Sequence, residues 1–240
     1  GNTAVCTAVV TVQDNIAPVA VCQDFTVALD ATGNATIVAG DIDNGSSDND
    51  SVASLSLDTS SFTCADLGTN TVTLTVTDPS GNSSTCTATV TVEDNINPTA
   101  VGQDITVQLD ATGNATITTA DIDNGSSDNC GAPTLGLDVA SFGCADVGPN
   151  TVTLTVTDGS GNSDSTTATV TVEDNIDPTA VCQDITIQLD ASGNASIVAG
   201  DIDNGSSDNC SVSLSADVTS FTAADLGANT VTLAVTDPSG

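Results

Sequence analysis

The stretch Thr71-Val-Thr-Leu-Thr-Val-Thr77 decides the fold class, because its apolar and polar residues alternate strictly. The apolar residues fall on one face of an extended chain and the threonines on the other, which is the period of a half-buried β-strand. The turn sequence Asp78-Pro-Ser-Gly-Asn82 follows, and residues 86–92 then alternate in the same way. These two strands are predicted to form a hairpin.

Further short strands are predicted earlier in the chain. Residues 25–29 and 35–37 flank the turn sequence Asp30-Ala-Thr-Gly-Asn34 and are predicted to form a second hairpin, and residues 55–57 form one more strand. No segment has helical periodicity. About seven short strands separated by frequent turns indicate an all-β fold, an antiparallel β-sandwich of immunoglobulin type.

The same pattern recurs along the chain. The motif Pro18-Val-Ala-Val-Cys22-Gln-Asp24 returns from Pro98 and again from Pro178. The sequence therefore predicts tandem immunoglobulin-like domains in a linear array. We expect the end of an earlier copy at 1–17, full copies at 18–97 and 98–177, and an incomplete copy at 178–240.

The limits of the sequence fit a piece of a longer array. Gly240 falls in the same register of the repeat as Gly1, once a one-residue deletion after Cys210 is allowed for. Neither a signal peptide nor an apolar run of membrane length is recognisable. Targeting information is expected outside this sequence.

The charge is one-sided, with 32 acidic residues and no Lys, Arg or His. No ion pair between side chains can form, so solvent cations or bound metal must offset the repulsion. All acids except Glu93 and Glu173 are Asp, a turn former and a short calcium ligand. Nucleic acid and anionic membranes are not expected as direct partners, because both require a basic face. Such acidity also suits disorder, but the apolar patterning favours a folded chain.

The densest acidic motif is Asp41-Ile-Asp43-Asn-Gly45-Ser-Ser-Asp48-Asn49, which recurs in every copy. Carboxylates gathered around a glycine turn can supply the six to eight oxygens that Ca²⁺ prefers. The alternative is an Asx-rich β-turn without metal. With calcium as the cofactor, the predicted ligands are Asp41, Asp43, Asp48, Asp121, Asp123, Asp128, Asp201, Asp203 and Asp208.

A second acidic motif lies at each copy boundary, shortly before the proline. It resembles the Asp-Asn linkers of cadherins, and the resemblance implies calcium between domains. The alternative is a short polar linker that binds no ion. The ligands that this hypothesis adds are Asp14, Asn15, Asp94, Asn95, Asp174 and Asn175, joined by Asp24, Asp104 and Asp184 six residues beyond each proline.

The second half of each copy carries a family resemblance. The run from Phe62-Thr-Cys-Ala-Asp-Leu-Gly through Thr-Val-Thr-Val-Glu-Asp94, followed by Pro98, resembles a hyalin repeat (HYR) domain. The resemblance implies an immunoglobulin-like fold and extracellular adhesion. In its acidic, Thr-rich style the chain is similar to the tandem repeats of giant bacterial surface adhesins. The Asp-rich middle of each copy departs from the animal versions, so their ligands are not transferred.

The cysteines differ between copies. Cys22 and Cys86 are both replaced in the second copy, by Gly102 and Thr166, which favours a Cys22–Cys86 disulfide. Cys130 and Cys144 are the cysteines that remain in the second copy, which favours a Cys130–Cys144 disulfide.

This assignment leaves four cysteines over. Cys64 and Cys210 lack partners, and Cys6 and Cys182 are expected to pair outside residues 1–240. No spacing supports zinc. Disulfides indicate an oxidising, extracellular location at a cell surface.

The residue inventory argues against catalysis. Without His, Lys, Arg, Tyr or Trp, the common general bases and oxyanion partners are absent, and the chain is predicted not to be an enzyme. The leading hypothesis is a stalk or filament segment of an adhesin, rigidified by calcium and disulfides. Its partners are neighbouring repeats, with other filament chains or a surface ligand as further candidates. The alternative is a repeated module that binds polysaccharide or a cell-surface protein, which the scarcity of aromatic residues disfavours.

Overall fold

The computed structural model describes residues 1–237. The predicted register at Gly240 therefore lies outside the described residues. The chain divides into two compact units that do not follow the copy boundaries. The first unit comprises Gly1–Thr99, Ser127–Thr134 and Val156–Asp164, and the second comprises Ala100–Ser126, Leu135–Thr155 and Ser165–Gly240. The loops of the second copy that lie against the first copy thus belong to the first unit.

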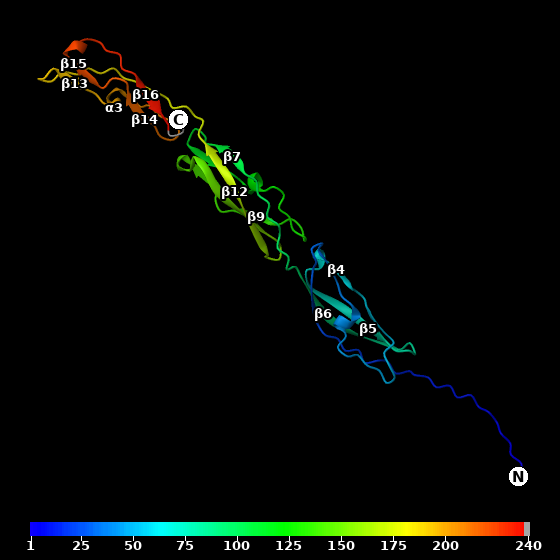
Figure 1. Ribbon diagram of the computed structural model, residues 1–240. Coiled ribbons are helices and arrows are strands. Elements are labelled where there is room, and N and C mark those ends of the chain that lie inside the picture. Colours follow the sequence, from blue (N-terminus) through cyan, green and yellow to red (C-terminus); the bar gives the residue numbers. More distant parts are fainter. Residues whose placement is uncertain (238–240) are drawn as a thin grey trace. The chain divides into compact units, whose positions relative to one another are not determined.

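The first copy contains six strands and two short helices (Figure 1). In chain order they are β1 (Phe25–Ala28), β2 (Asn34–Thr36), α1 (Ala39–Ile42), β3 (Ser54–Leu57), β4 (Ser61–Thr63), the 3-10 helix η1 (Cys64–Asp66), β5 (Gly68–Thr77) and β6 (Ser83–Glu93).

The same order returns in the second copy. It consists of β7 (Ile105–Gln108), β8 (Asn114–Thr116), α2 (Thr119–Ile122), β9 (Thr134–Leu137), β10 (Ser141–Gly143), η2 (Cys144–Asp146), β11 (Gly148–Thr157) and β12 (Ser163–Glu173). The third copy has β13 (Asn194–Ser196), α3 (Ala199–Ile202), β14 (Ser213–Ala216), β15 (Ser220–Thr222), η3 (Ala223–Asp225) and β16 (Leu233–Thr236).

Each full copy forms a four-stranded and a two-stranded sheet. In the first copy the orders are β1-β6-β5-β3 and β2-β4. The predicted β5–β6 hairpin is confirmed, with Val72 opposite Ala88 and Leu74 opposite Cys86. The all-β class and the tandem immunoglobulin-like sandwiches are likewise confirmed, although β1 runs parallel to β6.

The predicted second hairpin is wrong. Strand β2 pairs with β4, whereas β1 pairs with β6. The turn between β1 and β2 is built as expected, with Asp30 Oδ1 accepting hydrogen bonds from the amides of Thr32 and Asn34. It carries the chain from one sheet to the other, however. Leu29 before the turn and Ala35 after it are thereby buried in one core from different layers.

The core lies between these sheets. Val72, Leu74 and Val76 of β5 are completely buried, and they pack in one cluster with Phe62 of β4. Burial of each such side chain contributes about 1.5–3 kcal/mol. Ile42 of α1 is also completely buried, which explains a helix that the sequence did not predict. Four residues are too few to show a helical period.

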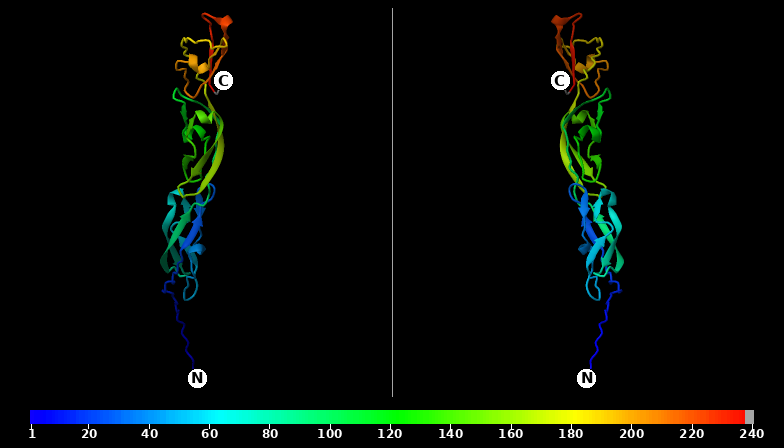
Figure 2. Two further views of the ribbon diagram at one scale, coloured as in Figure 1. Left: turned by 90° about the vertical axis from the view of Figure 1, so that its left-hand side faces the viewer. Right: turned by 90° about the vertical axis from the view of Figure 1, so that its right-hand side faces the viewer.

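No helix in residues 1–237 combines the length and the apolar character needed to cross a membrane. Residues 1–13 form an extended segment that is exposed throughout, as both views of Figure 2 show.

A carboxylate at the end of β3 predicts an acid-dependent contribution to stability. Asp58 Oδ1 accepts a hydrogen bond from the Thr73 amide at 2.9 Å, and Asp138 and Asp217 repeat this contact. The backbone hydrogen bond lowers the pKa of each carboxyl below its usual 3.8. A depressed native pKa stabilises the fold above the unfolded value, and the contribution is lost as the pH falls below about 4.

We expect the triple variant D58N/D138N/D217N to lose less stability than the parent between pH 5 and pH 2. Thermal unfolding monitored by circular dichroism measures this difference. The parent alone does not report it, because protonation of the other carboxylates relieves repulsion over the same range. Parallel pH curves for the two proteins would contradict the prediction.

Candidate metal centre

Three carboxylates converge within the first unit. One oxygen each from Asp94, Asp128 and Asp158 lies within 4.8 Å of the others. Asp94 directly follows β6 in the linker between copies, Asp128 lies in the loop after α2, and Asp158 directly follows β11. Asp94 is 5% exposed and Asp158 is 7% exposed. The cluster therefore combines a linker residue with two residues of the following copy.

The turn after β11 fixes Asp158. Its Oδ1 accepts hydrogen bonds from the amides of Ser160 and Asn162, and its Oδ2 accepts one from the Asn162 side chain. Burial raises the pKa of the Asp158 carboxyl, but hydrogen bonds from Asn162, Gly161 and Ser160 outweigh burial and hold it below its usual value. The group is therefore ready to act as an anionic ligand.

The loop after α2 orients the other members. Asp94 Oδ1 accepts hydrogen bonds from the Ile96 amide and from Asn129 Nδ2, both at 3.2 Å. Asp128 Oδ2 accepts one from the Cys130 amide at 2.8 Å. In each carboxylate the second oxygen is left without a donor.

These remaining oxygens are the unusual feature of the site. Asp94 Oδ2, Asp128 Oδ1 and Asn129 Oδ1 are buried and accept no hydrogen bond. A buried polar atom without a partner costs about 1–3 kcal/mol. Two carboxylates at this separation also repel each other by roughly 3 kcal/mol at an effective dielectric constant of 20. A cation among the oxygens would offset both costs.

The same arrangement recurs at the other boundaries. In residues 1–237, all buried side-chain nitrogen and oxygen atoms without a hydrogen-bond partner belong to residues at these boundaries. Besides those at Asp94, they are Asp48 Oδ1 before β3, and Asp174 Oδ2, Asp208 Oδ1 and Asn209 Oδ1 in the second unit. One oxygen each from Asp14, Asp48 and Asp50 also lies within 4.8 Å of the others.

The donors fit calcium better than a softer metal. Carboxylate and amide oxygens are the hard ligands that Ca²⁺ prefers, and water and carbonyl groups commonly complete its shell. Cys210 lies beside Asp174 and Asp208, but its sulfur is bonded to Cys144 and supplies no thiolate. A bound cation would supply positive charge shared by the linker and the following copy.

Disulfides join successive copies beside this cluster. Cys64 of η1 is bonded to Cys130 in the loop after α2, and Cys144 of η2 is bonded to Cys210 after α3. The predicted Cys130–Cys144 disulfide is therefore wrong, and Cys64 and Cys210 do have partners. Cys22–Cys86, by contrast, is formed as predicted.

The sequence held a signal for the correct pairing. Both disulfides between copies span 66 residues, and together they use all four cysteines that are not in Cys22–Cys86 or free. Comparison of the copies detects which cysteines survive together. It cannot show whether the partner is in the same copy or in the next.

A glycine lets the backbone approach this disulfide. Gly33 has φ of 74°, and a Cβ there would lie 2.6 Å from Cys64 Sγ and 2.9 Å from the Asn129 carbonyl oxygen. Gly113 repeats this approach to Cys144 and Asn209. The Asp30 and Asp110 turns are therefore packed against the loop of the following copy.

The structure places the predicted ligands in two groups. Asp48, Asp128 and Asp208 lie with Asp14, Asp94 and Asp174 at the boundaries. Asp158 has the same position in the second copy as Asp78, which was predicted only as a turn residue of the first copy. Their recurrence after the long alternating strand was the available signal.

Other predicted ligands have different roles in the structure, so the loop Asp41–Asp48 is not brought together as one site. Asp41, Asp121 and Asp201 accept hydrogen bonds from the amides that precede the short helices. Asp43, Asp123 and Asp203 accept hydrogen bonds from backbone amides of their own loops.

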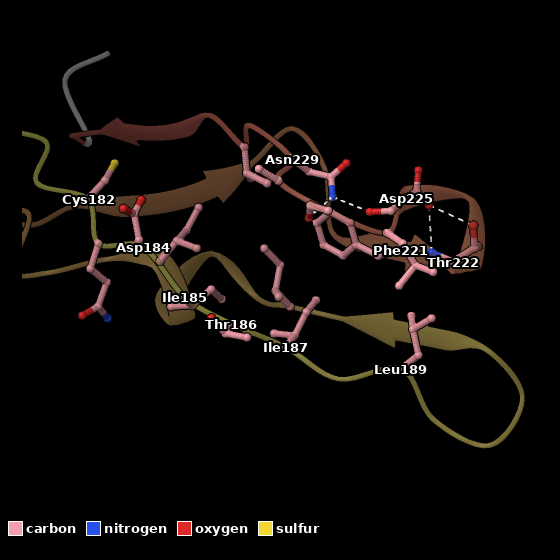
Figure 3. Close-up of a pocket in the computed structure, with 17 residues that line it drawn as sticks. Cys182, Asp184, Ile185, Thr186, Ile187, Leu189, Phe221, Thr222, Asp225 and Asn229 are labelled. Atoms are coloured by element: carbon pink, nitrogen blue, oxygen red, sulfur yellow. Dashed lines mark hydrogen bonds between the residues drawn. The ribbon is translucent and has the colours of Figure 1, made fainter.

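The remaining positions lie outside the cluster. Asp24 and Asp104 accept hydrogen bonds from the amides of Thr89 and Thr169, respectively. Asp184 lines a groove in the third copy (Figure 3). Asn95 and Asn175 donate to Glu93 and Glu173, and Asn15 is exposed.

No family model and no curated protein matches the chain. Among solved structures, it is similar to protocadherin gamma B7 extracellular cadherin domains 1–4, with 13% identity and a TM-score of 0.34 over 92% of this chain and 68% of that one. It is similar to human protocadherin-24 EC1-2, with 12% identity and a TM-score of 0.38 over 67% and 100%. It is also similar to an endo-fucoidan hydrolase of glycoside hydrolase family 107, with 13% identity and a TM-score of 0.24 over 65% of this chain and 34% of that one. Similarity at this level carries no argument about function.

The strand order, the repeated core and the joined boundaries define a class. The chain is a tandem repeat protein of immunoglobulin-like β-sandwiches whose successive copies are connected by disulfides.

Proposed function

We propose that this chain is a segment of an extracellular adhesin stalk or filament, in which calcium and a disulfide together fix each boundary between copies. The observation that carries the proposal is the boundary itself. Asp94, Asp128 and Asp158 converge there, and buried oxygens of Asp94 and Asp128 have no hydrogen-bond partner beside the Cys64–Cys130 bond. A stalk that bears force along its length needs rigid boundaries between its copies. The buried polar atoms without a hydrogen-bond partner are concentrated at these boundaries.

Hydrogen bonds between the copies support this function. Asn129 Nδ2 donates to Asp94 and also lies 3.4 Å from the Asp30 carbonyl oxygen. Asn162 Nδ2 donates to the Asp94 carbonyl oxygen at 3.0 Å. The linker is thus bonded to a loop and a turn of the copy that follows it, and rotation about the linker would break these bonds.

The location follows from the chemistry of the chain. Disulfides persist in oxidising compartments outside the cytosol, where calcium is abundant enough for sites of modest affinity. The resemblance to hyalin repeats supports an adhesion role, and the lack of basic and large aromatic side chains supports spacing over catalysis or glycan capture.

Small-angle scattering tests the role of calcium in holding the junctions. We expect the maximum dimension of the chain to be larger in millimolar calcium than in excess chelator, because bound cations restrict bending at each linker. The double variant D94N/D174N should show the chelated dimension in both conditions. D121N/D201N is the matched control, because those carboxylates cap short helices outside the cluster. Equal dimensions with and without calcium would refute the calcium-stiffened stalk.

A further inference from the structure

The outer surface of the four-stranded sheet in the first copy is built from hydroxyl side chains. On strand β5 a threonine stands at every second position from Thr69 to Thr77. These threonines point away from the core, because Val72, Leu74 and Val76 between them are completely buried. We call this surface the hydroxyl face. It consists of Thr69, Thr71, Thr73, Thr75 and Thr77 of β5, Ser83, Thr85, Thr87, Thr89 and Thr91 of β6, Thr26 of β1, and Ser54 and Ser56 of β3.

The strand register aligns these side chains in rows across the sheet. Thr73 lies opposite Thr87. Ser56 of β3, Thr75 of β5 and Thr85 of β6 form a row over three strands. Because the Cβ atoms of directly opposite residues are about 4.5–5.5 Å apart, the methyl and hydroxyl groups form a dense array.

The interior of the hydroxyl face carries no charge. Of its four strands only β6 contains an acidic residue, Glu93 at its last position. Asp24 directly precedes β1 and Asp58 directly follows β3, so both lie at the margin. The other acids of the first copy lie in turns, loops and short helices, at Asp30, Asp41, Asp43, Asp48, Asp50, Asp66, Asp78 and Asp94.

This distribution determines where two copies of the chain can meet. The chain has no basic residue, so two copies repel each other at any surface that carries the acids. The hydroxyl face is free of this repulsion. It is therefore the surface of the sandwich that a second copy can approach most closely.

The chemistry of the hydroxyl group suits an identical partner. A hydroxyl both donates and accepts a hydrogen bond, whereas a carboxylate only accepts. Without Lys, Arg, His, Tyr or Trp, the side-chain nitrogen and oxygen donors of the chain are hydroxyls and the amides of Asn and Gln. When two hydroxyl faces meet, the methyl groups are buried and the hydroxyls satisfy one another.

The shape of the sheet also favours a second sheet over a flat partner. Adjacent strands rotate by about 20–25°, so a flat crystalline surface would touch only part of the hydroxyl face. Two twisted sheets pack with their strands about 30° apart. At about 3.4 Å per residue and about 4.8 Å between strands, the four strands cover about 500 Å². Two such faces bury about 1,000 Å², which is the lower limit of a specific interface.

The second copy has an equivalent surface. Thr106 of β7 lies opposite Thr171 of β12, and threonine or serine occupies most outward positions of β11 and β12. Pro149 and Gly136 interrupt the pattern, and β12 contains the additional acid Asp164 near its start. Because each full copy offers such a face, longer arrays gain avidity when successive faces engage together.

We propose that the hydroxyl face binds the hydroxyl face of a second copy of this chain, so that stalks associate side by side. The acidic margin stays in solvent and forms the polar rim of the contact. The inference rests on the proposed function for the linear array and adds a lateral partner to it. A single pair of faces has the size of a transient interface, so the contact is weak for one sandwich and stronger for an array.

Sedimentation equilibrium tests the inference on the 240-residue chain in the C6S/C182S background, which prevents disulfides between chains. The buffer contains chelator and about 1 M sodium chloride, where the Debye length is about 3 Å and repulsion between acidic surfaces is screened. We expect reversible association that weakens as the salt is lowered. The double variant T87D/T167D should weaken it about a hundredfold or more, because it places like charges within the contact.

T36D/T116D is the matched control. Both threonines are exposed at outward positions of β2 and β8, so the same two charges are added to the other sheet. This variant should associate like the parent. The double variant T71D/T151D changes β5 and β11 instead of β6 and β12, and it should weaken association as T87D/T167D does. Circular dichroism verifies that each variant is folded.

A parent that stays monomeric at every concentration would overturn the inference, as would equal weakening by T36D/T116D and T87D/T167D. A monomeric parent that binds insoluble cellulose or chitin, and loses this binding in T87D/T167D, would assign the face to a polysaccharide and overturn it as well. Chelator separates the two proposals, because face-to-face association needs no metal. A monomeric chain would leave the calcium-stiffened stalk intact, and a chain that binds no calcium would still associate.

Discussion

Reduction of the three disulfides is expected to lengthen the chain about fivefold between Cys22 and Cys210 when the sandwiches are unfolded by force. In the oxidised chain the covalent path crosses from Cys22 to Cys86, returns along the backbone to Cys64, crosses to Cys130, and follows the backbone to Cys144 before it crosses to Cys210. That path contains roughly 36 residues, whereas the backbone contains roughly 188. At about 3.4 Å per extended residue the lengths are roughly 140 Å and 640 Å.

Single-molecule force spectroscopy measures this difference as a contour-length gain of about 500 Å on adding reductant. The reason is that the linker Glu93–Pro98 lies outside the shortest covalent path, so a sustained force bypasses it through Cys64–Cys130. The double variant C64S/C130S is the control and should extend slightly further than the oxidised parent. An oxidised path of roughly 110 residues would instead indicate Cys130 bonded to Cys144 and would contradict the structure.

Calcium is expected to raise the stability of the parent by about 2.7 kcal/mol per boundary site when its concentration is a hundred times the dissociation constant. For domains of this size that corresponds to a rise in Tm of about 10 °C or more. The variant D94N should lose the stabilisation that calcium contributes at the site of Asp94. It keeps the acceptor for the Ile96 amide but removes the negative charge beside Asp128 and Asp158.

The sign of the effect should reverse without metal. In chelator D94N should be at least as stable as the parent, because the repulsion among three carboxylates is reduced. In calcium it should be less stable, because the cation loses a ligand. Calorimetric titration should find one fewer calcium site, and D121N should leave both stability curves and the stoichiometry unchanged. A variant less stable than the parent in both conditions would show that Asp94 acts through its hydrogen bonds alone.

Much of the fold was predictable because it is local. The alternation in residues 71–77 and 86–92 specifies a hairpin whatever surrounds it, and the structure shows that hairpin as β5 and β6. The turn at Asp30 was also recognisable from its residue types. Its consequence was not, since an Asx turn can join two strands of one sheet or carry the chain between sheets. Burial of Leu29 and Ala35 from two layers decided the second outcome.

The carboxylate cluster at the boundary was predicted from the sequence only in part. A chain with 32 acids and no basic side chain must manage its charge, and the boundary aspartates Asp94 and Asp174 were predicted as ligands. Asp158 was not, because it is far away in the sequence and fits a turn equally well.

By itself, the sequence determined the repeat, the period-two strands, the hairpin at the end of each copy, and the Cys22–Cys86 bond. These depend on neighbours in the chain, or on pairs that vary together from copy to copy. The tertiary structure alone decided which cysteines pair between copies and which carboxylates meet. Each of these depends on atoms brought together from separate segments, such as the linker, the loop after α2 and the turn after β11. Pairing and ligation act over a few ångströms in space, and no sequence spacing within one copy specifies those distances.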